Sequence, residues 1–347
     1  MVKKINVGIA GFGMSGQIFQ AAFLHTNNHY NIEKVFERKS SKSKELYPYV
    51  NVVRTFEELL TEDIDLIVIS TPNKFHYSMA KQALEAGKNV IVEKPLCIYP
   101  QEAEELIQIA KEKEVLLSVY QNRRWDGGFV TAKRLIEEGR LGEVVDYEAH
   151  FDRFVKGASA KKWKETGEVG VGVMYDLGVH LIDQAVCLFG MPGEVYADIR
   201  SQREETLGDD NFQVYLYYNK MKAVLSASQM VKEAGPHIAV HGTKGSYVKY
   251  GMDVQEEKLK AGELPVGNDW GKDREENWGI LNTEADGVNY RERIETEIGN
   301  YHEFYNNIYG VLAGKEELAV KPEQVKDVLR IIRAAVESAE KGRRIKL

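Results

Sequence analysis

The first third of the chain alternates short apolar runs with amphipathic segments. Strands are predicted at 5–10, 32–36, 52–53, 65–70, 89–92 and 115–120, and helices at 17–24, 43–47, 56–60, 76–86 and 101–112. The run at 65–70 is apolar almost without alternation, which is typical of a strand covered on both faces. This order of elements predicts an α/β fold with a doubly wound, parallel Rossmann sheet.

The pattern changes after about residue 125. A helix is predicted at 129–138, and alternating strands follow at 144–154, 195–203, 211–219, 221–230, 237–241 and 246–250. Strict alternation indicates a sheet with one face toward water. We therefore predict a second α/β domain with a large, mainly antiparallel open sheet, and place the two domains at 1–122 and 123–347.

The remaining segments carry weaker patterns. Residues 252–298 are polar and rich in Glu, Asp and Gly, and we predict a long excursion rather than a third domain. Residues 325–341 predict a closing amphipathic helix. Tyr215, Tyr217 and Tyr218 lie in a predicted strand, where packing on the sheet face is favoured over a cofactor-binding role.

Composition narrows the class of protein. The 347 residues carry a net charge of −7 without a basic tail, so nucleic acid is not an expected partner. No apolar run approaches the roughly 18 residues that span a bilayer, and the N-terminus lacks a signal-peptide pattern. Cys97 and Cys187 are too few for a disulfide framework. We expect a cytoplasmic protein with no membrane partner.

A glycine-rich loop lies between the first strand and the first helix. Gly11, Gly13 and Gly16 have the spacing that permits a tight turn, close approach of a pyrophosphate and close packing of the helix. The helix N-terminus offers N–H groups and a positive dipole end to phosphates. The sequence thus predicts a dinucleotide site that includes Gly11, Phe12, Gly13, Met14, Ser15 and Gly16.

The end of the second strand bears on the choice of cofactor. Glu37 stands where an acidic residue takes the ribose 2′-hydroxyl of NAD. Arg38, Lys39 and Ser40 follow, and these residue types pair with the 2′-phosphate of NADP. A phosphate beside Glu37 is repelled unless that side chain turns away. We favour NADP and keep NAD as the alternative.

Two further segments end strands at the same sheet edge, where such folds bind ligands. Thr71, Pro72 and Asn73 are expected near the nicotinamide end of the cofactor. His76 follows, and bonding to this loop is favoured over a chemical role. Glu93 and Lys94 precede Pro95, and we expect a cis Lys94–Pro95 bond and a lysine that hydrogen-bonds or exchanges a proton with a carbinol oxygen.

A carboxylate and an imidazole stand four residues apart farther along the chain. Asp176 and His180 share one face if the segment is helical, and histidine suits proton transfer near neutral pH. Asp183 could orient the imidazole or cap a neighbouring element. We expect no metal site, because the sequence lacks paired cysteines and a His-Glu-x-x-His pattern.

Taken together, these motifs resemble the Gfo/Idh/MocA-type oxidoreductases, and the resemblance covers essentially the whole chain. Within the family, the stretch Ser118–Asp126 resembles the branch of NADP-dependent inositol dehydrogenases. The resemblance implies that Lys94, Asp176 and His180 act together in hydride transfer between nicotinamide C4 and a carbinol carbon of a cyclic polyol or sugar. It also implies pairing of subunits through the open sheet, as a homodimer or homotetramer.

Other hydroxyl groups of such a substrate need binding partners. Our candidates are Asn122, Arg123, Arg153, Trp163 and Tyr175, for each of which ordinary packing is an equal alternative. Two other functions stay open: glycoside cleavage or C=N reduction by the same fold, and a non-catalytic nucleotide-sensing protein. The second would not require Lys94 or His180, and both are present.

Overall fold

The computed structural model describes residues 4–155, 157, 167–204 and 207–347. These residues form two compact units. The first comprises residues 1–122, 255–270 and 301–326, and the second comprises 123–254, 271–300 and 327–347. The first unit therefore gathers two later segments of the chain in addition to its N-terminal part.

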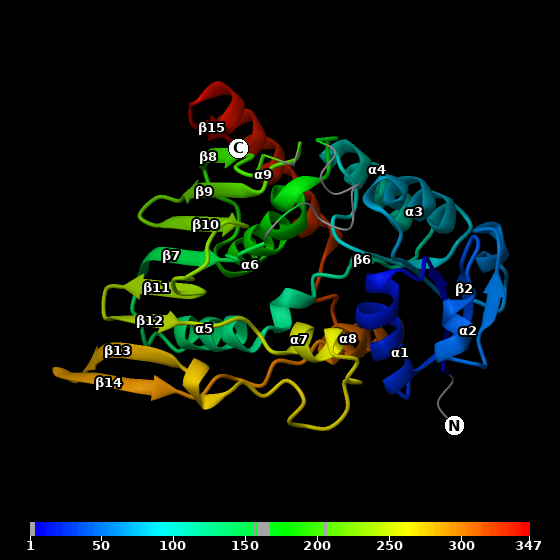
Figure 1. The fold of residues 1–347 in the computed structure, drawn as a ribbon, viewed down its shortest axis with the longest axis horizontal. Helices are drawn as coiled ribbons and strands as arrows, with labels where there is room; N and C mark the ends of the chain where they lie inside the picture. The colour runs from blue at the N-terminus through cyan, green and yellow to red at the C-terminus, as the bar shows by residue number, and fades with distance from the viewer. Residues whose placement is uncertain (1–3, 156, 158–166, 205–206) are drawn as a thin grey trace. The chain divides into compact units, whose positions relative to one another are not determined.

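The first unit contains a six-stranded parallel sheet with the order β3-β2-β1-β4-β5-β6 (Figure 1). Its strands are β1 (Ile5–Ala10), β2 (Tyr30–Phe36), β3 (Asn51–Val53), β4 (Leu66–Ile69), β5 (Asn89–Val92) and β6 (Leu117–Val119). Every residue of β4 is fully buried, as its uninterrupted apolar run predicts. The predicted Rossmann-type sheet is confirmed.

Helices connect these strands. They are η1 (Gly16–Ala21), α1 (Ala22–Thr26), α2 (Lys42–Leu46), η2 (Glu57–Leu59), η3 (Asn73–Phe75), α3 (His76–Glu85) and α4 (Pro100–Glu112). The later segments of this unit add α7 (Gln255–Lys260) and α8 (His302–Leu312). The hydroxyl of Tyr30 on β2 donates to the carbonyl of Tyr305 on α8 over 2.6 Å, which ties the added helix to the sheet.

The second unit contains a nine-stranded sheet with the order β14-β13-β12-β11-β7-β10-β9-β8-β15. Its strands are β7 (Val144–His150), β8 (Glu194–Arg200), β9 (Asn211–Tyr217), β10 (Lys222–Ser228), β11 (Ile238–Gly242), β12 (Gly245–Lys249), β13 (Gly279–Ala285), β14 (Val288–Ile294) and β15 (Ile345–Lys346). Among the described strands of this sheet, β7 and β10 pair in parallel and every other neighbouring pair is antiparallel. The predicted mainly antiparallel sheet is confirmed.

Helices cover one face of the nine-stranded sheet (Figure 1). They are α5 (Gly127–Glu137), α6 (Val179–Phe189) and α9 (Pro322–Lys341). On this face, neighbouring strands carry a row of buried residues in register: Ala197, Val214, Leu225, Ala149 and Ile238. The opposite face carries half-exposed residues, among them Tyr215 and Tyr217, whose rings stack 6.4 Å apart. These tyrosines pack on the sheet face, as predicted.

The prediction of an irregular excursion at 252–298 is partly wrong. This segment contains α7, the short turn η7 (Glu275–Asn277), and the hairpin β13–β14, which extends the sheet. The sequence pattern did not predict the hairpin, because β14 is exposed along almost its whole length and lacks apolar alternation. Within this segment, residues 252–254, 261–274 and 295–298 lack regular structure.

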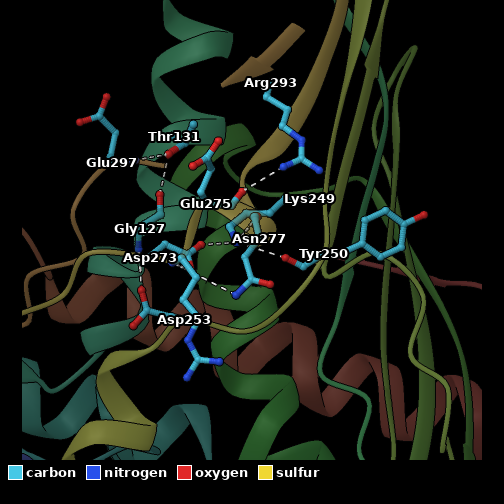
Figure 2. Close-up of polar contacts among 11 residues, drawn as sticks. Gly127, Thr131, Lys249, Tyr250, Asp253, Asp273, Glu275, Asn277, Arg293 and Glu297 are labelled. Carbon is cyan, nitrogen blue, oxygen red and sulfur yellow. Dashed lines mark hydrogen bonds and ion pairs between the residues drawn. The ribbon is translucent and has the colours of Figure 1, made fainter. Parts of the chain in front are cut away.

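A buried ion pair holds part of this segment to the sheet (Figure 2). Lys249 ends β12 on the helix-covered face and is 1% exposed, and its Nζ lies 2.7 Å from the carboxylate of Asp273. The same ammonium donates to the carbonyl oxygens of Tyr250 and Asn277. All three of its N–H donors therefore have acceptors, which buried charge requires.

No helix within the described ranges is both long and apolar enough to cross a membrane.

Candidate active site

The glycine loop between β1 and η1 has the geometry of a phosphate-binding turn. Gly11 has a φ of +95°, which side chains other than glycine disfavour. A Cβ on Gly16 would lie 2.4 Å from the carbonyl oxygen of Gly11, so helix and loop pack too closely for any side chain. A Cβ on Gly13 would meet nothing within 4 Å. Internal packing thus explains Gly16, whereas the open space at Gly13 fits the approach of a dinucleotide.

The other loop residues divide by exposure. Phe12 is buried and packs edge-on against Tyr47, with ring centroids 6.4 Å apart, whereas Met14 is 43% exposed. Ser15 donates from its hydroxyl to the carboxylate of Glu93, at the end of β5. Contacts of Phe12 and Ser15 with the protein therefore fix the loop, whereas Gly13 and Met14 are exposed to solvent.

The carboxylate of Glu37 turns into the protein. It accepts hydrogen bonds from the hydroxyls of Ser40 and Ser43 and from the backbone N–H groups of Lys42 and Ser43. Burial opposes its ionisation, but these hydrogen bonds hold the pKa of Glu37 below its ordinary value. Glu37 caps the start of α2 as an anion, and both of its oxygens are engaged.

The basic residues after Glu37 lie at the surface. Arg38, Lys39 and Ser40 are exposed. Neither Arg38 nor Lys39 forms an ion pair or a side-chain hydrogen bond within the ranges that the structure describes. Their charges are thus available to an anion at the carboxyl end of β2, while the carboxylate of Glu37 is directed elsewhere.

The loop after β4 carries Thr71, Pro72 and Asn73, which are exposed or half-buried. His76 is fully buried, and its ring nitrogens lie 2.7 Å from the carbonyl oxygens of Pro95 and Thr71. Burial lowers the pKa of His76, and the two carbonyls oppose that shift only in part. The histidine bridges two loops at the sheet edge, which is the role that the sequence favoured.

Lys94 follows β5 at the same edge of the sheet, is half-buried, and precedes a cis bond to Pro95, as predicted. Its neighbour Glu93 is buried and accepts from Ser15 and, over 2.5 Å, from Nε2 of Gln20. Tyr305 in turn donates to Gln20. Glu93 thus lies in a buried chain of polar groups beneath the backbone that carries Lys94. The sequence did not predict Gln20, because η1 and β5 are far apart along the chain.

The second unit carries Asp176 and His180. Asp176 lies in the π-helical turn η6 (Met174–Gly178), and His180 lies in the first turn of α6. Asp176 is half-buried and His180 is 5% exposed. Asp209 accepts a hydrogen bond from the N–H of Met174 over 2.7 Å and so anchors the start of this turn. Such π-turns are frequent at functional sites.

The spacing of Asp183 and His180 suggested that the carboxylate could orient the imidazole, but Asp183 pairs with Arg124 instead. Its two carboxylate oxygens each accept a hydrogen bond of 2.7 Å from Nε and Nη2 of Arg124. One residue farther along α6, Gln184 donates to the carbonyl of Arg123. The helix that bears His180 is therefore fastened to the turn η4 (Asn122–Trp125) by side chains that the sequence alone could not pair.

The substrate candidates occupy different environments. Asn122, Arg123 and Tyr175 are buried, and Arg153 is half-buried. The guanidinium of Arg123 lies 3.3 Å from Asp126 and 5.3 Å from the ring centroid of Phe151. Trp163 lies outside the described residues. Within the described ranges, no group of three or more His, Cys, Asp or Glu side chains could hold a metal ion.

Two models of one protein family together match most of the chain. Residues 5–121 match the oxidoreductase family NAD-binding Rossmann fold of Gfo/Idh/MocA proteins, and residues 133–347 match the C-terminal alpha/beta domain of the same family. The scyllo-inositol 2-dehydrogenase (NADP(+)) IolW of Bacillus subtilis is 38% identical over 347 residues, which cover 100% of this chain and 97% of that protein.

Solved structures agree with the match. The oxidoreductase YvaA of Bacillus subtilis is 38% identical and superposes with a TM-score of 0.96, over 100% of this chain and 99% of that one. An oxidoreductase of Bacteroides fragilis is 44% identical, with a TM-score of 0.91 over 99% and 100%. The chain therefore belongs to the Gfo/Idh/MocA family of oxidoreductases, with an NAD-binding Rossmann domain.

Proposed function

We propose that the protein is an NADP-dependent dehydrogenase that acts on a CH–OH group of a cyclic polyol, with an inositol as the preferred substrate class. The observation that carries the proposal is Lys94 at the carboxyl end of β5, beside the dinucleotide loop, in a chain that also bears Asp176 and His180 on η6 and α6. The name of IolW, a scyllo-inositol 2-dehydrogenase, supports the same substrate class.

The preference for NADP rests on Glu37. A carboxylate that accepts the ribose 2′-hydroxyl of NAD needs a free oxygen, and both oxygens of Glu37 are engaged by α2 and by Ser40. The same contacts direct its charge away from a 2′-phosphate. Arg38 and Lys39 then supply the side-chain donors for that phosphate, because the Ser40 hydroxyl already donates to Glu37. The NADP(+) in the name of IolW points in the same direction.

The chemistry that we propose uses three side chains. His180 accepts the proton of the reacting hydroxyl, because imidazole titrates near neutral pH. Lys94 donates a hydrogen bond to the same oxygen and stabilises the charge that develops there. Asp176 orients the substrate and stabilises the protonated imidazole. The bound nicotinamide supplies the hydride acceptor at C4.

The remaining hydroxyl groups of the substrate require a polar lining. We propose Asn122, Arg123, Arg153, Trp163 and Tyr175 for this role. Arg123 is the best supported of these, because Asp126 and the ring of Phe151 hold its guanidinium in one position. A fixed fork of N–H donors suits recognition of neighbouring hydroxyl groups.

The test measures initial rates of nicotinamide reduction with NADP and with NAD, each against a panel of inositols and aldoses. The proposal predicts rapid reduction of NADP with an inositol, and Lys94→Ala should lower turnover by about 100-fold or more while cofactor affinity stays nearly constant. Activity only with NAD would overturn the cofactor assignment. Turnover of Lys94→Ala equal to wild type would overturn the role of the lysine. Product formation without net cofactor reduction would favour glycoside cleavage.

We further propose a cytoplasmic homo-oligomer that pairs through the open face of the nine-stranded sheet. Half-exposed Tyr196, Tyr215 and Tyr217 lie on this face, and aromatic residues are enriched at stable interfaces. Light scattering coupled to gel filtration should give a dimer or a tetramer. Tyr215→Glu should shift the population toward monomer.

A further inference from the structure

Arg54 follows β3 and reaches across to the loop that follows β2. Its Nη1 donates to the carbonyl oxygen of Glu37 over 2.7 Å and also to that of Ser40. Its Nη2 donates to the hydroxyl of Ser41 over 2.8 Å. One guanidinium therefore joins three oxygen atoms of a single turn from two nitrogen atoms, whereas a lysine would have to reach all three from a single nitrogen.

The turn from Glu37 to Ser43 is held from two sides. The carboxylate of Glu37 takes up the N–H groups of Lys42 and Ser43, and Arg54 takes up the carbonyl oxygens of Glu37 and Ser40. Carbonyl oxygens that point toward a phosphate would repel it, whereas carbonyls engaged by a cation do so much less. The arrangement thus engages the carbonyl acceptors of the turn and leaves the side-chain donors of Arg38 and Lys39 for a phosphate.

The charge of this region is also unusual for an acidic protein. Residues 37–44 contain four basic side chains and one acidic one, Glu37. The guanidinium of Arg54 forms no ion pair with a carboxylate among the described residues. The nearby carboxylate of Glu58 accepts instead from the backbone N–H groups of Arg54 and Thr55 and from the Thr55 hydroxyl. The positive charge of Arg54 therefore adds to that of Arg38 and Lys39 without a paired anion.

We propose that Arg54 is a positioning residue that makes this turn selective for the 2′-phosphate of NADP. The inference rests on the proposed NADP preference and extends it to a residue that is not in the predicted cofactor site. Arg54 acts mainly through the turn, because three of its N–H donors are engaged by Glu37, Ser40 and Ser41. It fixes the backbone from which the side chains of Arg38 and Lys39 reach the phosphate.

The test measures binding of adenosine 2′,5′-bisphosphate and of AMP by calorimetry, which needs neither a substrate nor turnover. Wild type should bind the bisphosphate at least about tenfold more tightly than AMP. Arg54→Met should lose about tenfold in affinity for the bisphosphate, with less than about threefold change for AMP. Arg54→Lys, which keeps the charge but not the three-way contact, should lie between the two. Lys81→Met removes a charge on α3 from the same unit and should change neither affinity.

Three results would overturn the inference. Equal affinities of Arg54→Met and wild type for the bisphosphate would show that the contact does not matter. Equal losses for the bisphosphate and AMP would show a general structural role. A wild-type protein that does not distinguish the two ligands would overturn the NADP preference as well. If the bisphosphate result holds but no polyol is oxidised, the inference stands and the proposed substrate fails.

Discussion

Arg124 and Asp183 form a two-pronged ion pair inside the second unit, and both side chains are almost completely buried. The pair joins the turn η4 to α6, three residues beyond His180. A buried carboxylate with two matched donors fixes both the position and the rotation of the helix that carries it. The placement of His180 therefore depends on Arg124, which lies 56 residues earlier in the chain.

Asp183→Asn should destabilise the protein by about 3–5 kcal/mol, because it removes the carboxylate charge that Nε and Nη2 of the buried Arg124 guanidinium share. Urea unfolding measures this loss, and steady-state turnover should fall together with it. Asp327→Asn breaks the exposed pair between Asp327 and Arg330 and should cost less than about 1 kcal/mol. Equal effects of the two substitutions would contradict the structural role of Asp183.

Glu93→Gln should weaken cofactor binding and turnover together. The variant directs an amide N–H₂ group at the N–H₂ group of Gln20, so one buried donor loses its acceptor at a cost of about 1–3 kcal/mol. The double variant Gln20→Glu, Glu93→Gln exchanges the two groups and should restore much of the lost stability and affinity. Thermal melting and calorimetric binding of NADP provide the measurements. A single variant that binds and turns over like wild type would remove Glu93 from the positioning of Lys94.

Asp273→Ala should lower the free energy of unfolding by about 3–5 kcal/mol, since it leaves the buried ammonium of Lys249 without its carboxylate partner. The double variant Lys249→Met, Asp273→Leu removes both charges and should recover most of that loss. Denaturant midpoints compare the two, and Glu337→Ala, at an exposed pair with Lys341, serves as the control. A double variant as unstable as the single one would mean that packing of the segment, not charge pairing, determines the effect.

Burial raises the pKa of Asp209 to about 6, even though the N–H of Met174 donates to its carboxylate. Between about pH 4 and pH 6 the folded protein then holds a proton at this site that the unfolded chain has lost. The contribution of Asp209 to stability falls as pH rises through this window and stays constant above it. At about 1.4 kcal/mol per pKa unit, the change amounts to about 3 kcal/mol.

Asp209→Asn removes this titration while it keeps an acceptor for Met174. The stability of the variant relative to wild type should therefore rise by about 3 kcal/mol between pH 4 and pH 7. Urea unfolding of both proteins at several pH values gives the difference directly. A difference that does not vary with pH would show that Asp209 titrates at its ordinary value.

The sequence predicted those elements whose burial is uniform or strictly periodic. β4 is a continuous apolar run, β1 and β5 are apolar except for Asn6 and Asn89, and β9 alternates buried and half-exposed residues along its length. The sequence patterns did not predict the hairpin β13–β14 or helix α8. For the hairpin the reason is that an exposed edge strand carries no alternation of apolar and polar residues. Apolar patterning reports burial, and it fails where an element has little to bury.

The candidate site shows a similar division. The sequence placed Gly16, Lys94 and His180 on the right kinds of element, because each belongs to a local motif. It left Glu37 between two readings, since it could not tell which way the carboxylate turns. It could not pair Glu93 with Gln20, or Arg124 with Asp183, because contacts between distant segments depend on the packing of the whole unit.

The two ends of the nine-stranded sheet bear on self-association. At one end β14 is exposed, and Arg291, Glu292 and Arg293 follow one another along it. At the other end β15 consists of only two residues. Charged side chains and a very short border strand both discourage another chain from adding its own strand. Both edges of this sheet thus disfavour open-ended, amyloid-like growth, and the self-association that we propose would use its broad surface.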